Sequence, residues 1–161
     1  LSENKIRITS AEPNFDWIKH NAKGMDVTIT DDSFTTAALA LQGPNSRAIL
    51  NAVSSDSLNS LKFFWMMDTT FGDIPVSISR TGYTGDLGYE IWMDPKDALT
   101  VWDLLLEKGK SFGITPTGLQ AWMLPGLKLD SSCWMLIMYH LGMPLLNPAN
   151  HLPTNWVWDG L

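Results

Sequence analysis

Residues 80–90 read Arg-Thr-Gly-Tyr-Thr-Gly-Asp-Leu-Gly-Tyr-Glu, and this segment limits what the chain can fold into more than any other. Residues 74–79 before it alternate apolar and polar side chains, as a half-buried strand does. Residues 89–93 after it carry the aromatic and branched side chains that favour strands. The sequence therefore predicts a β-hairpin with the glycine-rich segment at its tip.

The side chains of this tip suit a flat ligand. Glycines such as Gly82 tolerate unusual backbone conformations and let the backbone approach a ligand closely. Tyr83 offers a stacking face, while Asp86 and Glu90 offer acceptors for a heterocycle with ring N–H and amino donors. Glycine-rich hairpin loops are also common as purely structural turns, so composition alone leaves both interpretations open.

The same segment resembles the R-T-G-Y-T-G-[ED]-x-G-[FY]-E signature of the glycine-cleavage T-protein (aminomethyltransferase) family, which binds folate. Residues 40–44, Ala-Leu-Gln-Gly-Pro, are similar to the A-L-Q-G-P turn of that family, and residues 46–50 to the helix after it. Residues 113–119, Gly-Ile-Thr-Pro-Thr-Gly-Leu, are similar to its G-I-x-P-x-G-L motif. The resemblance covers about residues 5–121.

This resemblance implies an α+β fold, an antiparallel sheet with flanking helices, which forms part of a folate-binding cloverleaf of three lobes. It implies a tetrahydrofolate-dependent one-carbon transferase, whose partner is a lipoyl carrier protein or a small methyl donor. Glu90 would accept hydrogen bonds from the pterin, Tyr83 would pack against it, and Arg80 would position the loop or pair with an acid. Asp86 and Gly82 are the remaining candidates for cofactor binding.

The chain has 161 residues and starts at Leu1, so we expect a fragment of the family's fold. The N-terminal family segment with its catalytic aspartate has no counterpart, so no catalytic residue is assigned and the chain alone is expected to be inactive. Two other functions stay open. One is a folate-binding or structural module without catalysis, and the other is the folate domain of a sarcosine- or dimethylglycine-type oxidoreductase or an O-demethylase.

Composition argues against several other classes. With a net charge of −6 and a pI of about 4.8, the surface repels nucleic-acid phosphates. No apolar run reaches the roughly 18 residues that a membrane span needs. The single cysteine, Cys133, fits a reducing, cytoplasmic location. We expect no metal site, because the pair Asp31 and Asp32 has no third ligand at a recognisable spacing and is more typical of a solvated turn.

Periodicity along the rest of the chain predicts further elements. Strands are expected over residues 5–9, 25–30 and 37–41, and helices over residues 14–22 and 44–53. A last helix after residue 94 places Ala98, Val101, Trp102 and Leu105 on one apolar face.

Residues 122–161 differ from the rest. Only three of these forty residues are charged, and they hold half of all tryptophans and methionines without helical or strand periodicity. We therefore divide the chain into a partial folate-binding domain, residues 1–121, and an atypical tail, residues 122–161, expected to be poorly packed.

Our hypothesis for this tail is a shifted reading frame. Trp122 and Met123 have single codons, and the frame one base earlier reads Leu, Val or Met followed by Asp. With permitted codons that frame continues L-D-V-A-R-V-E-A-G, which is similar to the family's pattern at this point.

Overall fold

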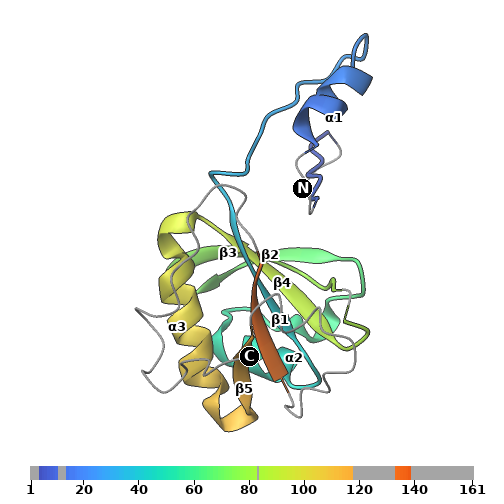
Figure 1. The fold of residues 1–161 in the computed structure, drawn as a ribbon. Coiled ribbons are helices and arrows are strands. Elements are labelled where there is room, and N and C mark those ends of the chain that lie inside the picture. The colour runs from blue at the N-terminus through green and yellow to red at the C-terminus, as the bar shows by residue number, and fades with distance from the viewer. Residues whose placement is uncertain (1–3, 11–13, 83, 118–132, 139–161) are drawn as a thin grey trace, which may run out of the picture. The chain divides into compact units, whose positions relative to one another are not determined.

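The structure, a computed structural model, describes residues 4–10, 14–82, 84–117 and 133–138. The chain divides into two compact units, residues 1–32 and residues 33–161 (Figure 1).

The first unit contains helix α1 (Phe15–Asn21), which confirms the helix predicted there. The strands predicted over residues 5–9 and 25–30 are wrong, because only Lys5 makes an isolated bridge and the other described residues of those two ranges form no strand. The side chains of Ile6 and Ile8 are 84% and 65% exposed. Alternation of apolar and polar residues predicts a strand only where the apolar side is buried, and here it is not.

The second unit is built on one six-stranded sheet. The strands are β1 (Ala37–Gln42), β2 (Met66–Phe71), β3 (Ile74–Ser79), β4 (Gly88–Met93), β5 (Ile114–Thr117) and β6 (Cys133–Met138). They lie in the order β2-β3-β4-β1-β6-β5, and every neighbouring pair is antiparallel except β5 with β6. The helices are α2 (Ser46–Val53), α3 (Ala98–Gly109) and the 3-10 turns η1 (Leu58–Ser60), η2 (Pro95–Asp97) and η3 (Lys110–Phe112).

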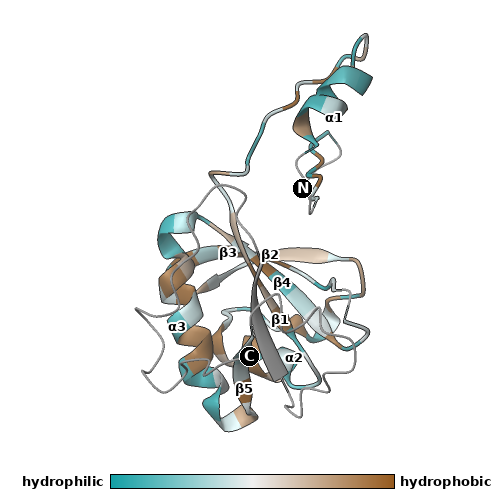
Figure 2. Ribbon diagram, viewed as in Figure 1, coloured by the Kyte–Doolittle hydropathy of each residue, from teal (hydrophilic) through white to brown (hydrophobic). Residues whose placement is uncertain are grey.

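One face of the sheet carries the hydrophobic core. Leu39, Ile91 and Ile78 are aligned across β1, β4 and β3 by the strand register, and all three are buried. They belong to the same core cluster as residues of α2 and α3, which therefore pack on this face. Figure 2 shows the amphipathic pattern of α3, with hydrophobic bands alternating with hydrophilic ones. Because neighbouring residues of a strand point to opposite faces, the row Ala40, Glu90 and Ser79 belongs to the other face.

The α+β class with an antiparallel sheet and flanking helices is thus confirmed. Strand β1 is buried along its whole length, and α2, β3, β4 and α3 all form where the sequence predicts them. Three strands, β2, β5 and β6, were not predicted. The last of these belongs to the atypical tail, while residues 122–132 and 139–161 lie outside the described residues. The described part of the chain contains no helix long and apolar enough to cross a membrane.

Candidate functional site

The predicted hairpin is confirmed. Strands β3 and β4 pair through Ser77 with Trp92, Ile78 with Ile91, and Ser79 with Glu90. The tip between them turns at Gly85, whose φ of +84° suits glycine and few other residues. Tyr83, the predicted stacking residue, lies outside the described residues. The hairpin therefore places Glu90 next to the tip, on the sheet face opposite the helices.

The carboxylate of Glu90 is half-buried and is held by two hydroxyl groups. Its Oε2 atom accepts a hydrogen bond of 2.5 Å from Thr81 Oγ1 and one of 3.3 Å from Ser79 Oγ. The two hydroxyl oxygens are 2.8 Å apart, and Trp92 Nε1 donates to Ser79 Oγ at 3.2 Å. We call Ser79, Thr81, Glu90 and Trp92 the Glu90 cluster. Glu90 Oε1 makes no hydrogen bond within the part of the chain that the structure describes.

A buried glutamine fixes the glycine-rich tip to β1. Gln42 is 3% exposed; its Nε2 donates to the Tyr89 carbonyl at 3.4 Å, and its Oε1 accepts from Thr84 Oγ1 at 3.1 Å. A Cβ added at Gly82 or Gly88 would overlap the end of this side chain. Gly82, predicted to admit a ligand, thus lies against the end of the Gln42 side chain, which would have to move if position 82 carried a Cβ.

The base of the tip is tied to the turn after β1. The carbonyl of Leu87 accepts a hydrogen bond of 2.7 Å from the Gly43 backbone N–H and one of 3.3 Å from Ser46 Oγ at the start of α2. These bonds link residues 40–46 to residues 80–90, two of the segments on which the family resemblance rests. The Ala-Leu-Gln-Gly-Pro turn and the glycine-rich hairpin thus form one local unit.

The hydrogen bonds of Arg80 are made with the segment before β2 and not with Glu90. Its Nη1 donates to the Leu61 carbonyl at 3.0 Å, and its backbone N–H donates to the Trp65 carbonyl at 2.9 Å. Its role in positioning the loop stays a prediction. In the described part of the chain Arg80 makes no ion pair with an acid.

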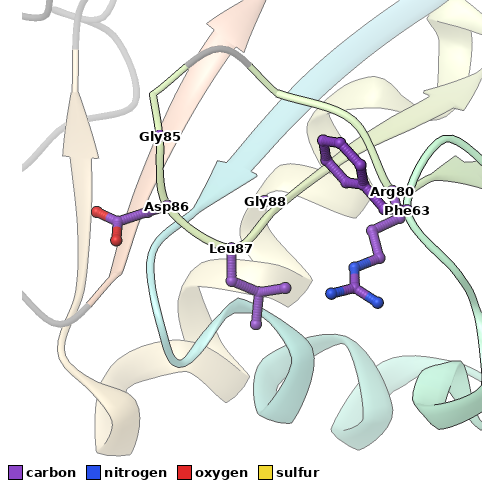
Figure 3. A pocket seen from close by; sticks show the side chains of 6 residues that line it. All are labelled: Phe63, Arg80, Gly85, Asp86, Leu87 and Gly88. Carbon is purple, nitrogen blue, oxygen red and sulfur yellow. The ribbon is translucent and has the colours of Figure 1, made fainter.

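A pocket of about 270 Å³ lies at the tip, and its lining residues are Phe63, Arg80, Gly85, Asp86, Leu87 and Gly88. Figure 3 shows Arg80 and Leu87 pointing to the same side, toward a helix, while the Asp86 carboxylate points away from them. Glu90 is not among the lining residues. The structure thus brings Glu90 together with Thr81 and Ser79, and it does not bring Glu90 together with Arg80.

Sequence reasoning did not find Thr81, Ser79 or Gln42 as site residues. The position of Ser79 follows from the register, because it lies directly opposite Glu90, but the register needs the tip length, which the sequence leaves open. Gln42 could have been found from its place in a strand of otherwise apolar residues, since a buried amide needs partners.

No group of three metal-ligating side chains occurs within the described residues. The carboxylate of Asp32 forms a 3.7 Å ion pair with Arg7 in the first unit.

The chain is similar in sequence to known aminomethyltransferases. The family model described as the GCVT N-terminal domain matches residues 2–132. An aminomethyltransferase of Halothermothrix orenii is 43% identical over 116 residues, which are 72% of this chain and 32% of that protein. One from Streptomyces avermitilis is 34% identical over 137 residues, or 85% of this chain and 34% of that protein. The chain thus spans about a third of the length of these curated relatives.

Among solved structures, the chain is similar to the glycine cleavage system aminomethyltransferase T from Bartonella henselae. That similarity has a TM-score of 0.46 at 9% sequence identity and covers 64% of this chain and 24% of the other.

Proposed function

Because the chain belongs to the GCVT N-terminal domain family, we propose that it is part of a tetrahydrofolate-dependent aminomethyltransferase of the glycine-cleavage T-protein type. The observation that carries this proposal is the position of Glu90. Its Oε2 atom is held by internal hydroxyl groups, and its Oε1 atom, which accepts no hydrogen bond from the described residues, would accept from a ligand N–H. A hydrogen bond from a neutral donor to a carboxylate is stronger than one between neutral groups.

Tetrahydrofolate fits the chemistry of this site. The pterin ring has ring N–H and amino donors along one edge, and Glu90 supplies an acceptor beside a tip with little side-chain bulk. The cofactor would supply N5, which takes up a one-carbon unit from a lipoyl carrier protein or a small methyl donor. The role of this chain's residues is to bind and orient the pterin through Glu90, since correct orientation lowers the barrier for transfer. Tyr83 and Asp86 remain proposed contacts of the ring and its linker.

Binding to the isolated chain is expected to be weak. A pocket assembled from several lobes loses affinity when some of them are missing, and each tenfold loss is about 1.4 kcal/mol. Tetrahydrofolate should be titrated into the 161-residue chain under anaerobic conditions, with chemical shifts in the protein NMR spectrum as the signal. We expect a dissociation constant in the range of about 0.1 to 1 mM or weaker.

Two variants test the carboxylate. Glu90→Gln retains the shape but removes the charge, and Glu90→Ala removes the group; both should weaken binding at least about tenfold. The control Glu107→Gln changes an exposed glutamate on α3, which lies on the helix side of the sheet, and should bind as the wild type does. Equal affinity in Glu90→Gln and the wild type would remove the basis of the proposal.

The second candidate is a folate-binding module without catalysis. If this chain binds tetrahydrofolate but transfers no one-carbon unit to it, the result would support the module. Transfer by the chain, with an aminomethyl-lipoyl carrier as the donor, would support the enzyme.

A further inference from the structure

Arg80 carries a buried donor at the pocket beside the hairpin tip. Its Nη1 donates to the Leu61 carbonyl at 3.0 Å, whereas its Nε is buried and has no acceptor among the described residues. Buried polar groups are nearly always hydrogen-bonded, and a charged donor without an acceptor is especially costly. The acceptor for Nε is therefore expected from a group that enters the pocket.

The remaining edge of the Arg80 guanidinium suits a carboxylate. Because Nη1 is bound to Leu61, the edge formed by Nε and Nη2 is left, and its two parallel N–H groups match the two oxygens of a carboxylate. No aspartate or glutamate within the described residues forms an ion pair with this guanidinium. A bound anion would thus supply both an acceptor and the opposite charge.

The rest of the pocket is largely apolar. It has a volume of about 270 Å³, and besides Arg80 its lining includes Phe63, Leu87 and two glycines of the tip. Figure 3 shows Leu87 pointing to the same side as Arg80, while Asp86, the remaining lining residue, turns its carboxylate away. A ligand in this pocket would therefore meet one cation and two apolar side chains.

The wall at Phe63 is held by the backbone of Arg80. The Trp65 N–H donates to the Lys62 carbonyl at 3.0 Å and closes a turn, and the Phe64 N–H donates to the Arg80 carbonyl at 3.0 Å. Phe64 has a φ of +63°, in the left-handed region that residues other than glycine rarely adopt, and it is 76% exposed. Strained backbone of this kind persists only where the surrounding structure fixes it, so the turn holds Phe63 in place beside the pocket.

We propose that this pocket, the Arg80 site, binds a short aliphatic carboxylate. The carboxylate lies on the Nε–Nη2 edge of Arg80, and the alkyl part packs against Phe63 and Leu87. A single negative charge is favoured over two, because Asp86 also lines the pocket and the chain has a net charge of −6. The Arg80 site is separate from the Glu90 cluster, since Glu90 does not line it, and it does not depend on tetrahydrofolate binding.

Titration of the wild-type 161-residue chain with sodium acetate, butyrate and phosphate tests this proposal. Sodium chloride keeps the ionic strength constant, and the NMR signal of the Arg80 Nε–H group, assigned by its loss in Arg80→Lys, reports binding. We expect a saturable shift with butyrate at a dissociation constant of about 1 to 10 mM. Acetate should bind at least about threefold more weakly, because butyrate buries a longer alkyl chain. Shifts that do not saturate, or phosphate binding as tightly as butyrate, would overturn the proposal.

Two variants separate the parts of the Arg80 site. Arg80→Lys keeps the charge but loses the paired donors, so butyrate should bind at least about fivefold more weakly, as the backbone amide signals of Gly85 and Gly88 report. Phe63→Ala, at a position that is 57% exposed, should remove most of the difference between butyrate and acetate. Lys108→Met, which removes an exposed lysine of α3, is the control and should bind both ligands as the wild type does.

The proposal stays testable if Arg80→Lys does not fold, as judged by amide signal dispersion. The wild-type titration followed at Gly85 and Gly88, together with Phe63→Ala, then decides. Butyrate that binds a folded Arg80→Lys as tightly as the wild type would place the anion elsewhere and overturn the proposal. Because these probes contain no pterin, the result stands whether or not the chain binds tetrahydrofolate through Glu90, and the proposed function is tested separately.

Discussion

Gln42 on β1 is paired directly with Gly88 on β4, and its side-chain oxygen occupies the space that a Cβ at position 88 would fill. It is the last residue pair between these two strands, at the base of the hairpin tip. Two different requirements meet here. The buried amide of Gln42 must find hydrogen-bond partners, and the backbone of β4 must pass close enough to provide one.

This contact predicts the effect of Gly88→Ala. The added methyl group would push against Gln42 and lower the free energy of unfolding by about 1 to 3 kcal/mol, as overpacking of a buried site does. Gln42→Ala alone is the control, because it removes the side chain that the new methyl group would meet. In the double variant Gly88→Ala with Gln42→Ala, the clash is gone, so the two costs should be less than additive in urea denaturation. Additive costs would mean that Gln42 and Gly88 do not interact.

The contact between Arg47 and Tyr89 predicts a second coupling. Tyr89 is fully buried, and its hydroxyl accepts a 2.8 Å hydrogen bond from Arg47 Nε on α2. Tyr89→Phe removes the acceptor and should lower the free energy of unfolding by about 1 kcal/mol. In the Arg47→Met variant, Tyr89→Phe should lower the free energy of unfolding by clearly less. A double-mutant cycle by urea denaturation measures this difference, and a coupling energy near zero would contradict the role of the bond.

The hairpin could be predicted because two independent signals agree there. Alternation over residues 74–79 gives the strand, and the glycines that follow give the turn. The edge strand β2 was missed because side-chain polarity does not follow burial along it: the apolar Met66 is exposed and the polar Thr69 is buried. Strand β5 was missed because Pro116 makes it look like a turn, although an edge strand tolerates proline.

Glu90 could be proposed as a site residue from the family signature, but the neighbours that hold its carboxylate could not be predicted. Thr81 and Ser79 are two residues apart in the sequence, and nothing local shows that both reach the same carboxylate oxygen. That arrangement depends on the register between β3 and β4 and on the path of the tip. Side-chain direction in a tip is a tertiary property, so the sequence pattern alone does not contain it.

The stability of the protein at low pH should depend on Asp94, the N-cap residue of η2. Asp94 accepts hydrogen bonds of 3.0 Å from the Lys96 backbone N–H and from Lys96 Nζ. These bonds lower the pKa of Asp94 below its usual 3.8, and the backbone bond has the larger effect. A carboxylate with a lowered folded-state pKa contributes stability above its unfolded pKa and loses it as the pH falls through the folded value. Asp94→Asn should therefore show a smaller loss of stability below about pH 4 than the wild type.

The matched control for this prediction is Asp103→Asn, which changes an exposed aspartate on α3. Thermal unfolding followed between pH 2 and pH 7 provides the comparison. An identical pH profile for Asp94→Asn and the wild type would contradict the role of the cap.

Strand β5 should depend on β6. In the described sheet, β5 has β6 as its single neighbour, and β6 joins it to β1. Leu136→Pro removes a ladder donor from the middle of β6 and should speed hydrogen exchange in residues 114–117 and 133–138. Exchange in β2 and β3, at the other end of the sheet, should change little. Rapid exchange of residues 133–138 in the wild type would mean that β6 does not form.

The reading frame of the tail is the last prediction. The family match ends at residue 132, past the boundary expected at residue 122 and directly before β6. The pairs Trp122-Met123 and Trp134-Met135 each require the bases TGG ATG. When these bases are read from one base earlier, they contain the codon GAT, which encodes Asp. We expect the nucleotide sequence of codons 115–161 to encode L-D-x-A-R-V-E-A-G in that earlier frame. Codons for residues 124–132 that do not encode this pattern one base earlier would contradict the shift and favour a divergent tail.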